Sequence, residues 1–271
     1  MSLLLLNGFE FPLTQANAEP VRAGALERGP GLGVRSGVRA AAWDLTCATG
    51  WLSQADARQV RGLVEGEGHV LAFDSTLTAT SYLWSSRGAV PSTQVTPAVG
   101  GRVPGRWGGG ALRVREDYQV LWPGVCSGSE WTVLAWAHPS DTDTGYWEHR
   151  TWRSDGAVWF NGVGPQFGYG QQAYVEGGAL VLTAGTDTHQ DWDEVVLLPY
   201  FLSDAWVAQA YGFHQATRWP PLPYVLASGA AVPGGAAEVQ GQAGGLQRVV
   251  AGPGAWWESF DFTLNRSPSS P

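Results

Sequence analysis

Aromatic and charged side chains are interleaved between residues 146 and 169, and this stretch has the clearest chemical meaning in the sequence. It contains Tyr146, Trp147, His149, Trp152, Trp159 and Tyr169, interspersed with Glu148, Arg150 and Arg153. Aromatic rings pack on the apolar faces of sugars, while carboxylates and arginines hydrogen-bond to sugar hydroxyls. The stretch therefore indicates a carbohydrate site. Tryptophans at this density are more often the core of a β-sandwich or a subunit contact, where Trp and Arg are also enriched, and both uses stay open.

A second polar group recurs at every other position before an apolar run. Its members are Asp187, His189, Asp191 and Asp193. On an extended backbone these side chains share one face, as metal ligands or acid and base groups would. The alternative is a polar turn at the rim of a sheet, which is the more frequent use of such residues.

A third candidate is a calcium site. Asp141, Asp143 and Gly145 have the spacing of the start of a calcium-binding loop, but a third acidic residue and the distal glutamate are missing. Ca²⁺ is accordingly the one cofactor that the sequence suggests, and a solvated turn is the alternative.

Enzymatic motifs are missing from the sequence. It has no nucleophile elbow, Walker loop, zinc-finger or zincin pattern, and no lysine for a Schiff base. Cys47 alternates with Trp43 and Leu45, which is typical of a small buried apolar residue, and with Cys126 it makes no disulfide framework. We therefore predict that the protein is not an enzyme.

The composition limits the partners. A net charge of −8 argues against non-specific binding to nucleic acids or anionic membranes, which requires neutralisation of phosphates. Protein or neutral sugar is the expected partner. The apolar run Leu3–Leu6 is too short for a signal peptide and has no basic flank, and no segment has the length of a membrane span. We expect synthesis in the cytoplasm of the host cell.

The stretch from Trp192 to Tyr211 must position the polar residues that precede it. Its apolar run, residues 195–198, predicts a buried strand, and Pro199 limits how far that strand pairs. Ser203 is then placed as an N-cap, and Asp204 lies in the first turn of a short helix, where the helix dipole favours a negative charge. We therefore expect a strand, a corner and a helix.

Three segments in this order resemble a known fold family. Residues 108–114 (GGGALRV), residues 131–139 (WTVLAWAHP) and the strand, corner and helix of residues 192–211 are similar to the entry, central and closing segments of laminin-G-like, concanavalin A-type jelly rolls. The resemblance covers roughly residues 105–213. It implies a two-sheet β-sandwich at residues 98–218, and a fold of this kind hosts many functions.

The N-terminal part resembles a second family. A half-buried strand at residues 41–47 is followed by a helix that Ser53 caps and that Gly66 or Gly68 ends, and then by a strand at residues 69–74. This order is similar to the N-terminal domain of bacteriophage distal-tail and baseplate proteins. It implies an assembly domain at residues 1–97, with a long arm at residues 15–38 and a linker at residues 85–107. Residues 219–271 are predicted to be short strands that pack back on this domain.

The fold class that follows is mainly β, with a small one-helix β domain beside a jelly roll. The resemblances imply a non-enzymatic virion protein of a bacteriophage tail or baseplate, located in the virion. Its partners would be copies of itself in a homo-oligomeric ring, other tail proteins and host surface glycan. Nucleic acid and membrane insertion are not expected. A stand-alone lectin module and, as a third hypothesis, a glycan-cleaving enzyme are the alternatives.

Overall fold

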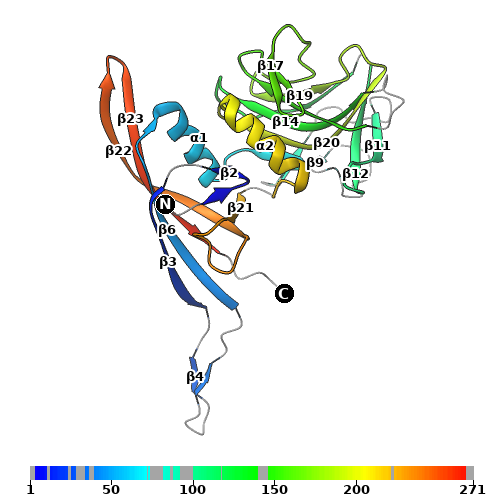
Figure 1. The fold of residues 1–271 in the computed structure, drawn as a ribbon. Helices are drawn as coiled ribbons and strands as arrows, with labels where there is room; N and C mark the ends of the chain where they lie inside the picture. Colours follow the sequence, from blue (N-terminus) through cyan, green and yellow to red (C-terminus); the bar gives the residue numbers. More distant parts are fainter. Residues whose placement is uncertain are drawn as a thin grey trace. The chain divides into compact units, whose positions relative to one another are not determined.

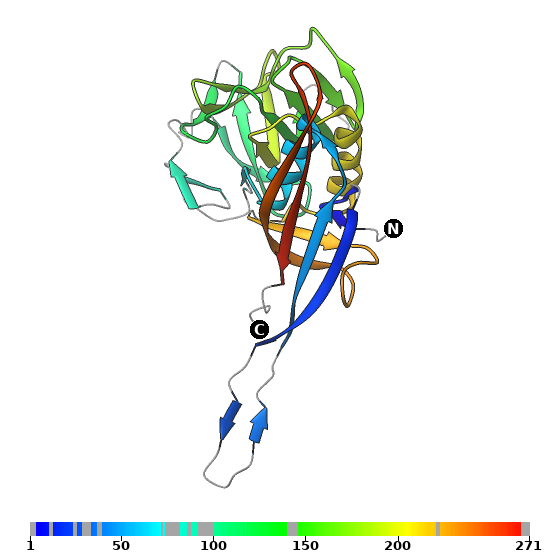
Figure 2. The same ribbon diagram turned by 90° about the vertical axis from the view of Figure 1, so that its left-hand side faces the viewer.

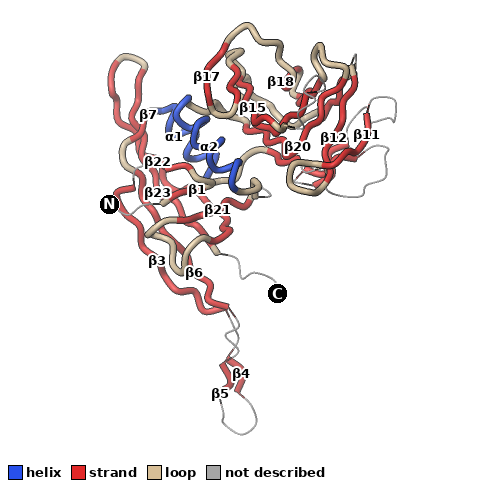
Figure 3. The backbone as a smooth tube through the Cα atoms, turned by 45° about the vertical axis from the view of Figure 1, so that its right-hand side comes forward, coloured by secondary structure: helices blue, strands red, loops and turns tan. Residues whose placement is uncertain are grey.

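Strands make up most of the described chain (Figure 3). The computed structural model describes residues 4–10, 13–23, 26–28, 34–36, 40–71, 73, 82–85, 88–91, 100–116, 118–139, 146–220 and 223–266. The chain divides into two units: unit 1 is Met1–Gly66 with Tyr224–Pro271, and unit 2 is Glu67–Pro223. The predicted class, mainly β with a one-helix unit and a jelly-roll sandwich, is confirmed. Neither helix of the described residues is long and apolar enough to span a membrane.

Unit 1 is built on one antiparallel sheet with the strand order β2-β1-β21-β22-β23-β6-β3, and β7 pairs with β23 as well. Figure 2 shows β3 and β6 side by side along their length. A separate ribbon pairs β4 with β5. The strands are β1 (Leu5–Leu6), β2 (Phe9–Glu10), β3 (Leu13–Ala23), β4 (Leu26–Arg28), β5 (Val34–Ser36), β6 (Ala40–Thr49), β7 (Leu52–Ser53), β21 (Tyr224–Ser228), β22 (Ala237–Gly252) and β23 (Ala255–Asn265).

Helix α1 (Gln54–Val64) packs on β22 and β23 of this sheet. The Ser53 side chain accepts a hydrogen bond from the Asp56 backbone N–H at 3.1 Å, which is the predicted N-cap. Ala57, Val60 and Leu63 are buried on the helix face toward the sheet. Cys47, on β6, is free and buried, and desolvation raises the pKa of its thiol to about 12. The thiol is therefore protonated and behaves as a small apolar side chain.

The first and last parts of the chain share this sheet. β23 pairs with β6 from Asp261 to Asn265, and β21 pairs with β1. The C-terminal strands are longer than the short strands expected from the sequence, because β22 and β23 form one continuous hairpin. Within the segment predicted as an arm, residues 15–23 belong to β3 and pair with β6, and β4 pairs with β5. The other residues of this segment lie outside the described part of the chain.

Unit 2 contains a large antiparallel sheet with the order β10-β9-β8-β20-β14-β15-β16-β17, in which β12 pairs with β20 and β11 with β12. A second sheet has the order β13-β19-β18. The strands are β8 (His69–Leu71), β9 (Tyr82–Ser85), β10 (Gly88–Pro91), β11 (Gly100–Pro104), β12 (Gly110–Arg115), β13 (Gln119–Trp122), β14 (Thr132–Pro139), β15 (Glu148–Arg153), β16 (Val158–Phe160), β17 (Val163–Gln166), β18 (Ala173–Glu176), β19 (Ala179–Thr183) and β20 (His189–Leu198).

The jelly-roll core lies between these two sheets. It includes Trp122 and Leu182 of the small sheet and Val133, Trp152 and Trp192 of the large one, all almost fully buried. Strand β8, expected with the N-terminal unit, lies in unit 2, where its Val70 and Leu71 pair with Val196 and Val195 of β20. Strand pairing of this kind joins distant residues and leaves no local trace in composition.

A corner at residues 199–203 leads from β20 into helix α2 (Asp204–Ala216), which Figure 1 shows in yellow along the large sheet of unit 2. The Thr132 hydroxyl donates to the Tyr200 carbonyl at 2.9 Å and accepts from the Leu202 N–H at 3.0 Å. Arg153 adds hydrogen bonds to the Leu202 carbonyl and the Asp204 carboxylate. The predicted strand, corner and helix are present, and α2 extends beyond Tyr211.

Candidate functional site

Strand β15 contributes side chains both to a pocket and to a buried polar cluster of unit 2. Successive residues of a strand point to opposite faces of the sheet, so these side chains lie on two faces. Glu148, Arg150 and Trp152 line a pocket on one face. His149, the next residue along from Glu148, lies on the other face against α2, where it contacts His214 and Tyr211. The aromatic and charged stretch of the sequence is thus divided between a pocket and a buried cluster.

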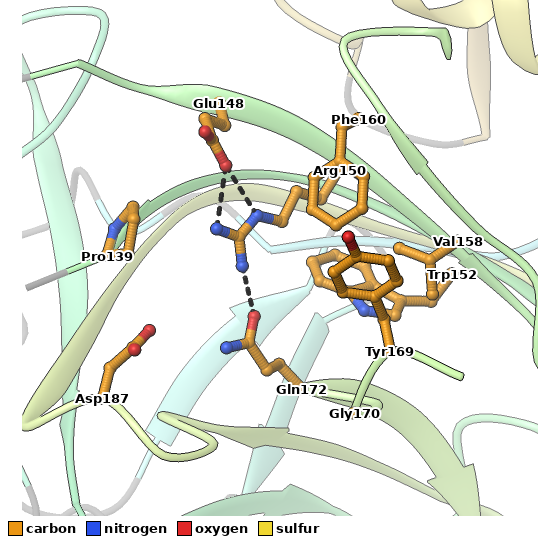
Figure 4. Close-up of a pocket in the computed structure, with 10 residues that line it drawn as sticks. All are labelled: Pro139, Glu148, Arg150, Trp152, Val158, Phe160, Tyr169, Gly170, Gln172 and Asp187. Carbon is orange, nitrogen blue, oxygen red and sulfur yellow. Dashed lines mark hydrogen bonds and ion pairs between the residues drawn. The ribbon is translucent and has the colours of Figure 1, made fainter. Parts of the chain in front are cut away.

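The pocket has a volume of about 250 Å³, and Figure 4 shows its lining side chains. Its aromatic side is formed by Trp152, Phe160 and Tyr169, and the ring centroids of Phe160 and Tyr169 lie 5.2 Å apart in an edge-on arrangement. Tyr169 is 56% exposed, whereas Trp152 is 1% exposed and packs against Trp192 of the core. Tyr169 is therefore the accessible ring, and Trp152 is part of the support beneath it. The lining residues are Pro139, Glu148, Arg150, Trp152, Val158, Phe160, Tyr169, Gly170, Gln172 and Asp187.

Arg150 holds the polar side of the pocket together. Its Nε and Nη2 donate to Glu148 Oε2 at 3.0 and 2.8 Å, and its Nη1 donates to Gln172 Oε1. Its guanidinium carbon also lies 5.3 Å from the centroid of the Phe160 ring. Three of the five guanidinium N–H groups are used in these bonds, so the guanidinium is held in one orientation and keeps donors for a ligand.

Asp187 completes the polar wall. It comes from the turn between β19 and β20, where its N–H donates to the Ala184 carbonyl at 3.3 Å. Figure 4 shows its carboxylate pointing into the same space as the Arg150 guanidinium and Gln172. The pocket thus combines apolar ring surface, hydrogen-bond donors and hydrogen-bond acceptors within a small volume, which suits a ligand that is both apolar and rich in hydroxyl groups.

On the opposite face, a chain of buried polar groups joins β15, α2 and β20. His149 Nε2 lies 3.2 Å from His214 Nδ1, and His214 Nε2 lies 3.0 Å from Glu194 Oε2. Glu194 also pairs with Arg218 through its other carboxylate oxygen. Both histidines are fully buried. The Trp136 ring lies edge-to-face with both imidazoles, with centroid distances of 5.1 Å to His149 and 5.8 Å to His214.

A bulge in β20 makes this cluster possible. The register between β14 and β20 shifts between Leu134 and Trp136, and Glu194 has a positive φ of 45°. A bulge lets neighbouring residues point to the same face of a sheet. Asp193 accepts a hydrogen bond from the Arg106 N–H at 2.8 Å, while Glu194 reaches His214.

Desolvation is the main reason that both histidines stay neutral. Burial, the neighbouring His214 and the Arg106 charge hold the pKa of His149 well below its usual range. Burial and the charges of Arg106 and Arg218 lower the pKa of His214 to about 3. Because neither imidazole has exposed surface, neither histidine can exchange a proton directly with a ligand. The chain of buried polar groups is positioned to hold α2 on the sheet.

The predicted binding residues have different positions. Trp152 and Tyr169 line the pocket, and His149 belongs to the buried cluster. Trp159 is buried, and the guanidinium carbon of Arg153 lies 4.5 Å from the centroid of its ring. Trp147 stacks at a tilt on His138, with a centroid distance of 5.5 Å, and Tyr146 is exposed.

Two of the alternating acidic residues are used in structural contacts. Asp191 forms a two-pronged ion pair with Arg113 at 2.7 and 2.8 Å, and Asp193 binds the Arg106 backbone. Within the described ranges, no group of three or more His, Cys, Asp or Glu side chains is arranged to hold a metal ion. The predicted calcium ligands Asp141 and Asp143 lie outside the described residues.

The sequence did not predict that Phe160, Gln172 and Asp187 would line the pocket. Phe160 could have been found, because it faces the same side of the sheet as Trp152 once β15 and β16 are paired as a hairpin. Gln172 and Asp187 come from segments flanking the small sheet, and no local pattern indicates their approach. In comparisons with known proteins, the chain matches no protein-family model and no curated protein, so the two family resemblances stay predictions.

Proposed function

We propose that this protein is a non-enzymatic structural component of a bacteriophage-type tail or baseplate, with a jelly-roll unit that binds saccharide in the pocket on β15. The observation that carries the saccharide part is the side-by-side arrangement of an exposed tyrosine ring and a fixed donor and acceptor group. Tyr169 supplies the ring, and Arg150 with Glu148 supplies the polar group. Such a pairing matches the apolar and hydroxyl faces of a sugar.

The assembly part of the proposal is supported by the tip of the β22–β23 hairpin. Val250 lies opposite Trp256, and Val249 lies opposite Trp257. Consecutive residues of a strand point to opposite faces, so both faces of the tip carry large apolar side chains. These side chains are 43–63% exposed. Residues 249–257 contain no charged side chain.

Exposed apolar surface of this kind commonly serves in protein association. The exposed tryptophans among the residues whose burial is described are Trp51, Trp256 and Trp257, and β7, which follows Trp51, pairs with β23 at Trp257. We propose that this corner of unit 1 contacts a second copy of the chain in a symmetric ring. A ring of three or more copies repeats one head-to-tail contact, in which this corner would pack on a different surface of the next copy.

Two measurements test the proposal. The mass of the purified chain in solution should be a whole multiple, greater than one, of the 28.9 kDa monomer. A monomer at all concentrations would contradict the assembly role. A glycan array should give binding that is lost in Arg150→Ala. Binding that survives this substitution would locate the saccharide elsewhere.

The stand-alone lectin is the second candidate, and the same pocket favours it. It differs in the expected mass, because a lectin module of this size needs no ring. A glycan-cleaving enzyme is tested by release of reducing sugar from bound polysaccharide. We expect none, since the Arg150 guanidinium bonds to the Glu148 carboxylate and holds it as a hydrogen-bond acceptor.

A further inference from the structure

The charged side chains that line the β15 pocket limit which saccharides can bind there. Its lining includes one guanidinium, Arg150, and two carboxylates, Glu148 and Asp187. The formal net charge of the lining is therefore −1. A ligand with a charge of its own must be accommodated against at least one of these groups.

An anionic sugar is disfavoured. The only cation among the lining residues, Arg150, already donates twice to Glu148 Oε2. The carboxylate of a sugar acid would have to displace Glu148 from the guanidinium or share it at close range, with Asp187 contributing a further negative charge. Like charges in a partly desolvated site repel strongly.

A cationic ligand is disfavoured for the complementary reason. Arg150 lies among the aromatic residues, with its guanidinium carbon 5.3 Å from the Phe160 ring centroid. The Phe160 ring, one of the aromatic surfaces that could attract a ligand cation, is therefore already near a protein cation. A purely apolar ligand would strip water from Arg150, Glu148 and Asp187 without replacing the lost hydrogen bonds.

An uncharged polyhydroxyl ligand meets none of these penalties, because each hydroxyl both donates and accepts. Its hydroxyls can accept from the unused N–H groups of Arg150 and donate to Glu148 or Asp187, while its apolar face lies on Tyr169. The cavity of about 250 Å³ is smaller than the roughly 300–1,000 Å³ of sites for drug-sized ligands. One sugar ring is therefore the expected occupant.

We propose that the pocket formed by Glu148, Arg150, Phe160, Tyr169, Gln172 and Asp187 binds a single uncharged sugar residue and selects against sugars that carry a carboxylate. This inference rests on the proposed saccharide function of the same site. It adds the class of sugar and identifies Glu148 as a residue that sets specificity.

The test measures selectivity on the full chain at pH 7. Ligand-observed NMR titrations compare the methyl glycosides of glucose, galactose and mannose with the matching glucuronate, galacturonate and mannuronate. We expect at least one neutral glycoside to bind, and its uronate to bind at least about ten-fold more weakly. Glu148→Gln keeps an acceptor for Arg150 but removes the repelling charge, so the preference for the neutral sugar should shrink by about ten-fold.

Glu176→Gln is the matched control. Glu176 is exposed on β18 and is not among the lining residues, so its substitution removes the same charge from unit 2 and should leave the preference unchanged. An equal loss of preference in both variants would mean that net charge, and not Glu148, sets selectivity, which overturns the inference.

The other outcomes separate the inference from the function on which it rests. If the wild-type chain binds a uronate as tightly as its neutral counterpart or more tightly, the inference is wrong and the saccharide function stands. If an oligomer of the preferred sugar binds much more tightly than the single glycoside, the single-residue site is wrong. If no saccharide binds in the titrations or on the array, the proposed saccharide function is itself wrong, and the inference with it.

Discussion

His149 and His214 meet at 3.2 Å, Nε2 to Nδ1, in the interior of unit 2, one on strand β15 and the other on helix α2. Neither ring has exposed surface. Two imidazoles can share a hydrogen bond only when at least one of the two facing nitrogens lacks a proton, so the contact requires that the pair is not doubly protonated. The attachment of α2 to the sheet is thereby linked to pH.

The first prediction concerns this linkage. Both histidines have folded-state pKa values below the ordinary value of 6.5, about 3 for His214. The unfolded chain therefore binds more protons than the folded chain between pH 6.5 and about 3. The free energy of unfolding should accordingly fall as the pH falls below 6.5, by up to about 1.4 kcal/mol per pH unit for each histidine.

Urea denaturation at several pH values between 8 and 4, followed by tryptophan fluorescence, measures this slope. His149→Gln removes one of the two titrating groups, so its slope should be shallower than that of the wild type by up to about 1.4 kcal/mol per pH unit. Equal slopes for the two proteins would show that the pair does not contribute.

The second prediction separates binding from stability at the pocket. Tyr169 is 56% exposed, so Tyr169→Ala should weaken saccharide binding and leave the melting temperature unchanged. Trp152 is 1% exposed in the core, and Trp152→Ala should lower the free energy of unfolding by about 3–5 kcal/mol. Calorimetry and glycan binding on both variants check this. Tyr146→Ala, also at an exposed aromatic residue, is the control that should change neither property.

The third prediction concerns a close approach of strand and helix in unit 1. A Cβ atom at Gly241 of β22 would lie 2.2 Å from the Val64 carbonyl oxygen at the end of α1. Gly241→Ala should therefore force the helix away from the sheet and cost about 1–3 kcal/mol of stability. Gly245 lies on the same strand and has no neighbour within 4 Å of a Cβ. Thermal unfolding of Gly245→Ala should match the wild type, and equal losses in both variants would contradict the packing argument.

The fourth prediction tests the hairpin tip. Trp256→Ala and Trp257→Ala together remove two exposed rings, so the assembled mass measured by light scattering should fall toward that of the monomer without a loss of melting temperature. Tyr118→Ala, an exposed ring in unit 2, should leave the mass unchanged. An unaltered mass in the double variant would exclude the hairpin tip as the contact between copies.

Much of the local structure could be predicted from the sequence. The cap at Ser53, the helix after it and the strand, corner and helix after Trp192 all depend on residues within a few positions of one another. The alternating residues 41–47 also lie in a strand, β6. The mainly β class follows from the same local signals, because alternation, turn residues and caps are properties of short segments. The jelly roll was expected only from the resemblance of three segments to a known fold family.

The candidate site was predictable in part. The sequence indicated a carbohydrate site in the stretch that contains β15, but it treated the aromatic residues of that stretch as one group. In the folded chain Trp152 supports the pocket and His149 faces α2, because neighbouring strand residues point to opposite faces. Which face is the pocket depends on Tyr169, Gln172 and Asp187, which arrive from other segments.

The sequence by itself determined where the two helices of the described residues begin and where several of the strands and turns lie. The tertiary structure alone decided that β8 joins the jelly roll, that β23 pairs with β6, and that Glu194 turns toward His214 through a bulge. The physical reason is the distance along the chain over which each kind of interaction acts. Backbone preferences and caps act over a few residues, whereas strand partners and buried polar contacts are selected by the packing of segments far apart in the chain.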